Sequence, residues 1–520
     1  MKSRLIEINE WIVAGEISRA KRALLELSHS KVSGIDQAIE LASLYRRVDW
    51  NSRGLNVLSP FVIGRGRLLP QANAGAKIEY ADCLKNLGLL NEARKILLSD
   101  EIKKVPRARF ILGLSYLHDY ELKKAEEELS DLFHHTPADL SPYQKQIIGV
   151  NLLMAMLRDL ETRSRHEQFE SVFNQVQSEC QSQNYQLLLR HLLVINFQFK
   201  VLGKTIKKAD LIEKIKFKNL PDFSRKTAEL YWCLAGFMLG EISEKQFTKE
   251  IRDLRSECVD LRLFEVMREI DYHRARLTKK NQMLQNVYLH TIRQSYRNKI
   301  VLLSVKIKKN INERVLQNIL NSRAEEIINF DLVLLKEEPL LVRLLIMLAQ
   351  EQYMPLSIHF LWNALMPERH FIEPSSRQSI HQLVKRLRHF LILKGIPLEI
   401  SFDQTGYRLR SAPKIKVRLV WPESWVVDSI QSLNYLNFIE TIQKNFNKPS
   451  QFKLREVMSL FPGVSRRTIQ FFMAKALSEA KLEKQGKNKG ASYRWVTVKS
   501  KTNSELIRSL SGSRARSEPS

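Results

Sequence analysis

Two segments of the chain place polar and basic side chains on one face of an expected helix. Residues 376–395 carry Ser379, Gln382 and Arg386 three and four residues apart, together with Lys385 and His389. The second segment, residues 461–495, contains another expected helix. Its outward side chains are expected to be Arg466, Arg467, Gln470, Phe471 and Lys475. Arginine can donate two hydrogen bonds to guanine, and glutamine can bond to adenine at two atoms. Side chains of these types at this spacing suit a helix that contacts bases in a DNA groove.

The sequence offers no comparable set of residues for catalysis. Residues 202–205 read LGKT, but Gln198 stands where a phosphate-binding loop needs a glycine. Residues 166–170, HEQFE, lack the second histidine of a zinc protease motif, and no GxSxG occurs. His134 and His135 are expected to face solvent. We therefore expect no enzyme activity, no cofactor and no metal site.

The charge of the chain is strongly unequal. Its 83 Lys and Arg residues exceed 56 Asp and Glu residues by 27, which indicates a polyanionic partner, most often nucleic acid. An anionic membrane surface is the weaker alternative. No apolar stretch has the length of a membrane span or signal peptide. We expect a soluble protein of a reducing compartment, with free buried thiols at Cys83, Cys180, Cys233 and Cys258.

A helix–turn–helix spacing recurs in residues 1–299. Intervals of five and four residues separate the members of three sets, Gly15–Ala20–Leu24, Gly88–Ala93–Leu97 and Tyr120–Ala125–Leu129. A small residue lets two antiparallel helices approach closely, and a large one fills the groove between them. Residues 106–137 resemble a tetratricopeptide repeat. This resemblance implies a helical solenoid that binds a protein or peptide on its concave face, and a scaffold without a ligand is the alternative.

The pattern changes between residues 299 and 330. The segment IVLLSVKIKK, residues 300–309, alternates like a strand, and residues 311–322 have the pattern of a short helix. Residues 325–335, EEIINFDLVLL, alternate again and predict a second strand. We interpret residues 300–325 as a connector.

From Pro339 the expected order is helix, helix, long helix, hairpin. The two short helices cover residues 339–351 and 356–367. The long helix, residues 376–395, has an inward stripe and ends at Gly395. Its apolar members are Ile380, Val384, Leu387 and Leu391. Residues 398–410, LEISFDQTGYRLR, alternate as two short strands.

Residues 326–411 resemble the OmpR-type winged-helix DNA-binding domain. The segments LLIMLA, LSIHFLW, IHQLVKRLRHFL and TGYRL carry this resemblance. It implies that the third helix enters the major groove. It also implies the roles of several residues: Ser379, Gln382 and Arg386 at base edges, Arg388 at the phosphates, and Lys385, His389 and Arg408 as further DNA contacts.

The chain departs from the pattern of that family at several points. Asp403 and Gln404 stand where the family has Arg-Gly, and an acidic hairpin tip is unsuited to a minor-groove contact. Leu383 replaces a usual histidine. The phosphorylated receiver domain typical of the family is missing, so we expect another part of the chain to control it.

Residues 430–498 repeat the order of three helices and a hairpin. A turn at residues 462–464 precedes Ser465, which is expected to cap the third helix, and Ile469, Phe472, Met473 and Leu477 are expected to pack inward. The segment is similar to a generic winged helix of bacterial transcription factors. That resemblance implies DNA contacts from Arg466, Arg467, Gln470, Lys475, Lys484, Lys487, Lys489 and Arg494. A winged helix used for protein contacts is the alternative.

The sequence as a whole predicts a mainly α fold, a helical-repeat solenoid followed by two small winged helices. The expected domains are residues 1–299, 326–411 and 430–498, with a disordered basic tail over 499–520. The predicted function is a DNA-binding transcriptional regulator. Its expected partners are double-stranded DNA, a protein or peptide on the repeats, and RNA polymerase, in the cytoplasm at the nucleoid. A plasmid-type replication initiator and a non-DNA scaffold are the alternatives.

Overall fold

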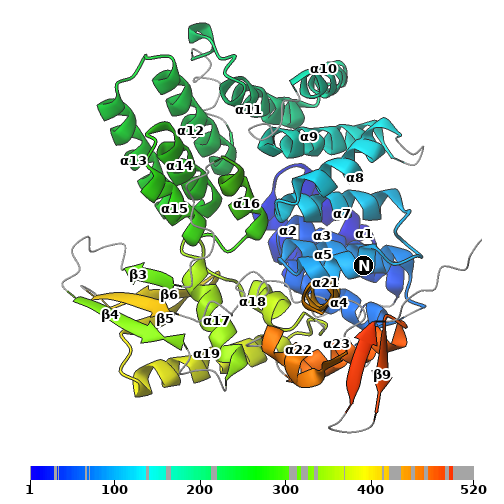
Figure 1. The fold of residues 1–520 in the computed structure, drawn as a ribbon. Helices are drawn as coiled ribbons and strands as arrows, with labels where there is room; N and C mark the ends of the chain where they lie inside the picture. Colours follow the sequence, from blue (N-terminus) through cyan, green and yellow to red (C-terminus); the bar gives the residue numbers. More distant parts are fainter. Residues whose placement is uncertain are drawn as a thin grey trace, which may run out of the picture. The chain divides into compact units, whose positions relative to one another are not determined.

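The chain is mainly helical, as the sequence predicts (Figure 1). The structure is a computed structural model, and it divides the chain into two compact units, residues 1–336 with 341–423 and residues 337–340 with 424–520. The residues that it describes are 2–27, 32, 34–64, 67–69, 71–135, 140–159, 166–211, 220–303, 313–317, 326–332, 338–367, 369–412, 415–420, 435–446, 451–461, 466–486 and 491–495. None of the described helices is long and apolar enough to cross a membrane.

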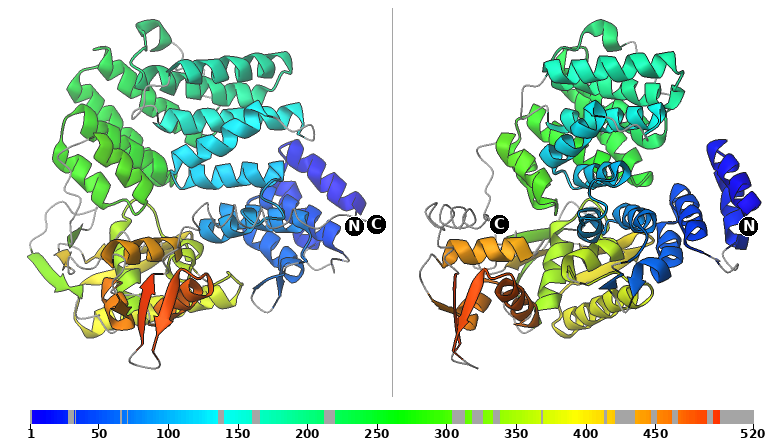
Figure 2. Two further views of the ribbon diagram at one scale, coloured as in Figure 1. Left: turned by 45° about the vertical axis from the view of Figure 1, so that its right-hand side comes forward. Right: turned by 90° about the vertical axis from the view of Figure 1, so that its right-hand side faces the viewer.

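Residues 2–303 of the first unit, here called the helical region, are a series of helices in which most members pack on their sequence neighbours. Figure 2 shows them from two further sides. A two-residue hairpin, β1 (Ile63–Gly64) with β2 (Arg67–Leu68), interrupts the series. The helices are α1 (Lys2–Val13), α2 (Ile17–Leu27), α3 (Ile35–Arg47), α4 (Asn51–Val62), α5 (Ala74–Asn86), α6 (Leu90–Leu97), α7 (Pro106–His118), α8 (Leu122–His134), α9 (Pro142–Asp159), α10 (His166–Ser182), α11 (Gln186–Leu202), α12 (Asp222–Met238), α13 (Glu244–Asp260), α14 (Phe264–Leu277), α15 (Asn281–Leu289) and α16 (Gln294–Leu303).

One kind of turn recurs at the ends of these helices. After α1, Gly15 has a φ of +81°, and the N–H of Glu16 donates to the carbonyl of Trp11. This is the Schellman arrangement, in which a left-handed residue lets the chain satisfy the last free carbonyls of a helix. The same conformation occurs after other helices of the region, at Asp49, Gly88, Tyr120, Asn184, Lys204, Gly240, Arg262 and Lys279. The turn reverses the chain, so the next helix packs beside the one just completed.

The small residues singled out by the repeat spacing lie at helix contacts. Ala20, Ala93 and Ala125 are fully buried. At Gly113 of α7 a methyl group would meet the side chain of Leu129 on α8 at 2.9 Å. The alanines of the repeat spacing are therefore buried, and the close contact of α7 with α8 leaves no room for a larger residue at position 113.

The connector differs from its prediction at two places. Residues 300–303 complete α16 instead of starting a strand, while residues 304–312 lie outside the described part. Glu313–Gln317 form strand β3, where the sequence predicted a short helix. Pairing explains the difference, because β3 runs antiparallel to β7 (Ile415–Val420), and a strand partner so distant in sequence leaves no local signal. The predicted second strand is correct, since β4 (Glu326–Asp331) pairs with the other edge of β7.

Residues 338–411, here called the first module, follow the predicted order. Helices α17 (Pro339–Gln350) and α18 (Ile358–Leu365) precede the long helix α19 (Ser375–Leu393). Gly395, two residues after the end of α19, has a φ of +61°. Strands β5 (Leu398–Asp403) and β6 (Gly406–Ser411) form an antiparallel hairpin. Leu356 also bridges to Tyr407. A Cβ at position 406 would lie 2.4 Å from the carbonyl oxygen of Leu356, so only glycine fits at this position.

A buried carboxylate joins the first module to the helical region. Glu351, directly after α17, accepts hydrogen bonds from the backbone N–H groups of Ile292, Tyr353 and Met354 at 3.1 to 3.2 Å. The same carboxylate lies 3.3 Å from the guanidinium of Arg268 on α14. Arg268 and Glu351 are 0% and 2% exposed. This ion pair is therefore shielded from water and fixes the end of α17 against α14.

A second contact between the same parts lies at α6. Glu92 accepts a hydrogen bond from the backbone N–H of Phe371 at 3.0 Å and lies 2.7 Å from Nδ1 of His370. The N–H of Asn91 donates to the side chain of Asn363 on α18. The helical region therefore holds the first module at two places that lie far apart in the sequence.

The second unit contains a further set of three helices and a small sheet. Its elements are α21 (Tyr435–Asn445), β8 (Phe452–Lys453), α22 (Leu454–Leu460), α23 (Arg466–Ser478), β9 (Leu482–Gln485) and β10 (Ser492–Trp495), with the strands in the order β8–β10–β9. Ile469, Phe472 and Met473 are buried as predicted, and Leu477 is half-buried. We use the name second module for residues 435–495.

Removal of the Glu351 carboxylate should destabilise the first unit. The variant Glu351→Ala leaves the buried Arg268 charge and three backbone N–H groups without an acceptor, so the free energy of unfolding should fall by about 3–5 kcal/mol. Urea unfolding followed by circular dichroism measures this change. The matched control is Glu399→Ala on the exposed side of β5. It should lower the free energy of unfolding by less than about 0.5 kcal/mol. An equal effect of both variants would contradict the importance of the pair.

Candidate nucleic-acid interface

Helix α19 has one buried and one exposed face, as the sequence predicts. The inward residues Ile380, Val384, Leu387 and Leu391 are at most 1% exposed. The opposite face exposes Ser379, Gln382, Lys385, Arg386 and His389. The helix contains no acidic residue. Its outer surface can therefore donate hydrogen bonds and carries positive charge, which are the properties that contact with DNA needs.

Gln378, which the sequence did not single out, is exposed on the same face one turn before Gln382. The interval of four residues was a usable signal for it. The face ends at Ile392 and Leu393, which are 77% and 68% exposed. The polar surface of α19 therefore runs from Gln378 to His389.

Arg388 and Arg408 make contacts within the protein. Arg388 donates to the carbonyl of Ile400 from Nε and Nη2, at 2.9 and 2.6 Å. This guanidinium therefore attaches α19 to β5. Arg408 donates to the carbonyl of Tyr353, and its guanidinium lies 4.7 Å from the ring centre of Phe264 on α14. Arg408 thus belongs to the contact with the helical region and is not gathered with the α19 face.

The tip of the β5–β6 hairpin also faces the helical region. Asp403 accepts a hydrogen bond from the Thr405 hydroxyl at 2.8 Å and lies 3.5 Å from the Arg408 guanidinium. Arg262, in the turn between α13 and α14, donates to the side chain of Gln404 at 3.4 Å. The tip therefore makes contacts within its own chain, while Gln404 and Thr405 remain exposed.

A short ion-pair network fixes the start of α19. The Glu373 carboxylate lies 2.8 Å from Arg377 on the first turn of α19 and 3.5 Å from His359 on α18. The neighbouring His359 and then Arg377 lower the pKa of Glu373 to about 2, although burial acts in the opposite direction. The network orients the leading end of the helix, where Gln378 and Ser379 lie.

In the second module the third helix exposes Arg466 and Gln470, four residues apart, beside Phe471, which is 50% exposed. Lys475 is half-buried, and Lys484 on β9 is exposed. Arg494 lies opposite Glu483 across the hairpin and forms an ion pair with it at 2.8 Å. The predictions for the Arg467 side chain, Lys487, Lys489 and the Ser465 cap fall outside the described residues.

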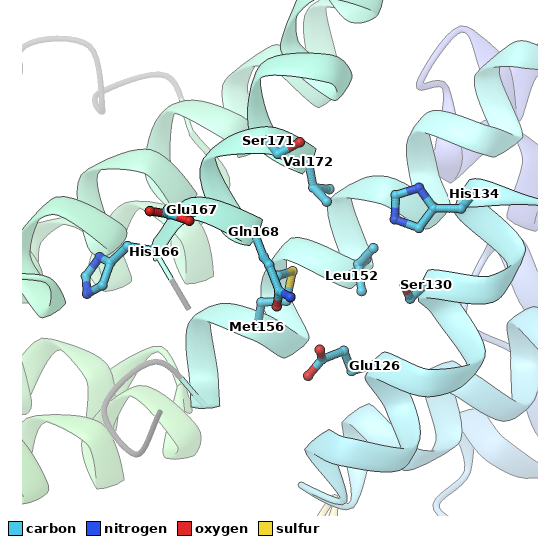
Figure 3. Close-up of a pocket in the computed structure, with 10 residues that line it drawn as sticks. All are labelled: Glu126, Ser130, His134, Leu152, Met156, His166, Glu167, Gln168, Ser171 and Val172. Carbon is cyan, nitrogen blue, oxygen red and sulfur yellow. The ribbon is translucent and has the colours of Figure 1, made fainter. Parts of the chain in front are cut away.

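The helical region carries a groove of about 1050 Å³ that is open to solvent. Figure 3 shows that α8, α9 and α10 each supply residues that line it, with Glu126 on one side and Glu167 on the other. His134 also lines the groove, and its neighbour His135 lies 3.0 Å from Asp131. Both histidines are exposed, as predicted. The groove is acidic and wide, so it suits an extended segment more than a small ligand.

Within the described part of the chain, no cluster of His, Cys, Asp and Glu could hold a metal ion. The four cysteines are free and buried.

No known protein-family model and no curated protein matches this chain.

The Glu373 network should make the stability of the first module depend on acid pH. The folded pKa of this carboxyl is depressed, so its contribution is complete above about pH 4.5 and disappears as the pH falls toward 2. The melting-temperature difference between the wild-type protein and Glu373→Gln should shrink over that range. A scan of melting temperature against pH tests this.

The control for that scan is Glu399→Gln, because Glu399 is exposed on β5. This variant should leave the melting temperature almost unchanged at every pH. A difference between wild type and Glu373→Gln that stays constant from pH 6 to pH 2 would rule out the ionised network.

Proposed function

We propose that this protein is a DNA-binding transcriptional regulator. The exposed face of α19 carries the proposal, because it combines Gln378, Ser379, Gln382, Lys385 and Arg386 on a helix without acidic residues. The opposite face of α19 packs in the core of the first module, so the polar face has a fixed orientation. A helix with these properties fits the major groove, where Arg and Gln can distinguish bases.

The order of elements supports a winged-helix reading of both modules. In each, two short helices precede a third helix with an exposed polar face, and an antiparallel hairpin follows. In the first module the hairpin tip contacts the helical region, so we assign DNA reading there to α19 alone. In the second module Arg466 and Gln470 are the corresponding exposed residues of α23.

We assign control of DNA binding to the helical region. Its repeated turns and closely packed helix pairs support a solenoid of tetratricopeptide character. The groove among α8, α9 and α10 is the surface that we propose for a protein or peptide partner. RNA polymerase is a further partner of a regulator of this kind, and the cytoplasm, at the nucleoid, is the matching location.

A scaffold that binds no DNA is the second candidate. The contacts of Arg408 and Gln404 favour it, because through them the hairpin packs on the helical region of its own chain. A replication initiator also pairs two winged helices on repeated DNA sites. Sequencing of the DNA fragments retained by the purified protein distinguishes the three: single operators indicate a regulator, tandem direct repeats an initiator, and no enrichment a scaffold.

DNA binding should depend steeply on salt. Each phosphate neutralised by Lys or Arg releases condensed counterions, so the logarithm of affinity should fall by about 0.9 per contact for each unit of log salt. Fluorescence anisotropy with a labelled duplex between about 50 and 200 mM salt measures the slope. A flat response would contradict phosphate contacts and favour the scaffold.

The two modules should contribute differently to recognition. Arg386→Ala should weaken the free energy of DNA binding at the preferred site by about 1–3 kcal/mol, because it removes a possible guanine contact. It should also relax specificity at one or two base pairs. Replacement of Lys484, Lys487 and Lys489 together should weaken binding to all duplexes about equally and flatten the salt slope.

Competition between specific and scrambled duplexes separates these two effects. A matched control is Arg190→Gln, an exposed arginine on α11 of the helical region, which changes charge without touching either module. The assignment is reversed if the lysine variant loses specificity while Arg386→Ala loses only general affinity.

A further inference from the structure

The groove among α8, α9 and α10 has a charge opposite to that of the whole chain. Of the described residues that line it, Glu126 and Glu167 are carboxylates, and none is Lys or Arg. A second hollow of about 370 Å³ continues over α8, and Glu127 and Asp131 line it. The two hollows share three residues of α8, so they form one concave surface, here called the acidic surface. This surface attracts cations, although the 27 excess positive charges of the chain attract anions.

The cations near the acidic surface do not balance its carboxylates. Arg109 of α7 lies 3.0 Å from Glu128 and 2.6 Å from Asp131, so one cation serves two carboxylates of α8. The ion pair of Glu127 is long, 3.9 Å, and joins it to an exposed lysine of the same helix. On the other side of the groove, α10 contains three glutamates and no Lys or Arg. Among the described residues, no Lys or Arg lies within ion-pair distance of Glu167.

The spacing of the carboxylates indicates what kind of cation the acidic surface accepts. Within the described residues, the His, Asp and Glu side chains do not converge closely enough to hold a metal ion. Figure 3 shows Met156 and Gln168 between Glu126 on one side and Glu167 on the other. Carboxylates that are spread along an open groove match several separate positive charges on one elongated ligand.

The uncharged side chains of the groove suit a polypeptide backbone. Ser130 on α8 and Gln168 and Ser171 on α10 line the groove with hydroxyl and amide groups. Such groups can both donate and accept hydrogen bonds, as the N–H and carbonyl groups of an extended peptide require. The apolar part of the lining is small, because Leu152 and Met156 are only 1% and 6% exposed. A polar, basic peptide therefore fits the groove better than an apolar one.

We propose that the acidic surface binds an extended segment of a partner protein that is rich in Lys and Arg. Basic side chains of the segment pair with Glu126, Glu127 and Glu167, and its backbone bonds to the hydroxyl and amide groups between them. This inference rests on the proposed function, in which the same groove receives a protein or peptide, and it adds the chemistry of that partner. Because like charges repel, the acidic surface excludes DNA, so the partner and DNA occupy different surfaces.

Fluorescence anisotropy of labelled peptides with the full-length protein tests the proposal without reference to DNA. The probes are peptides of six dipeptide repeats, Ser-Lys, Ser-Glu or Ser-Gln, and spermidine is a small polyamine competitor. The Ser-Lys peptide should bind, and its affinity should fall as salt rises, because salt screens exposed charges. The Ser-Glu and Ser-Gln peptides should bind at least about tenfold more weakly, because they lack the charged hydrogen bonds.

Three results would overturn the proposal. They are no binding of the Ser-Lys peptide at low salt, equal binding of the Ser-Glu or Ser-Gln peptide, and complete displacement of the Ser-Lys peptide by an equal concentration of spermidine. The last result would assign the groove to a polyamine.

Paired variants locate the binding in the groove. Glu126→Gln combined with Glu167→Gln removes one carboxylate from each side and should weaken binding of the Ser-Lys peptide about tenfold or more. The matched control combines Glu10→Gln with Glu244→Gln, at exposed positions of α1 and α13 that do not line the groove. It changes the net charge of the chain equally and should bind the peptide like the wild type. Equal weakening in both double variants would refute the location.

A parallel titration with duplex DNA separates this inference from the proposed function. If the Ser-Lys peptide does not bind while salt-dependent DNA binding persists, the partner assignment is wrong and the regulator stands. If the peptide binds in the groove while DNA does not bind, the peptide site stands and the protein is a scaffold.

Discussion

The carboxylate of Glu351 is the interaction on which the arrangement of the first unit depends. An ionised group with 2% exposure is stable only when hydrogen bonds and an opposite charge replace the water that it has lost. Here three backbone N–H groups and Arg268 do so. One of these N–H groups, that of Ile292, belongs to the helical region. The carboxylate therefore specifies one orientation of α17 relative to α14, which a purely apolar contact would define less sharply.

This orientation decides which surfaces of the first module are free. With the end of α17 fixed to α14, the β5–β6 hairpin meets the helical region through Gln404 and Arg408. The contact at Glu92 holds the loop before α19 from another side. The outer face of α19 takes part in neither contact. The packing that brings the hairpin tip to the helical region thus leaves the polar face of α19 exposed.

Helix α14 has a central place because its faces meet different environments. Arg268 points to the first module, whereas Glu265 and Glu269 line a small cavity among α9, α11, α12, α14 and α16. Asp271, further along the same helix, accepts a hydrogen bond from the Tyr353 hydroxyl. One helix therefore supplies side chains both to the interior of the helical region and to its contact with the first module.

The sequence by itself determined the local elements of this protein. The 3.6-residue periodicity predicted the three helices of the first module and the buried stripe of α19. The repeat spacing singled out Gly15 and Gly88, and both adopt positive φ, which glycine does without strain. The exposed face of α19 followed from the same periodicity. These features were predictable because each depends on residues within a few positions of one another.

Only the tertiary structure decided the features that depend on distant partners. The turns at Asp49 and Arg262 adopt positive φ without glycine, because packing of the flanking helices compensates for the strain. Strand β3 exists because β7, about 100 residues later, offers it an edge. In the folded chain, Arg388 donates to the backbone of β5 and Arg408 contacts Phe264 of α14. The type of a side chain indicates what it can bond to, but folding decides which partner comes within reach.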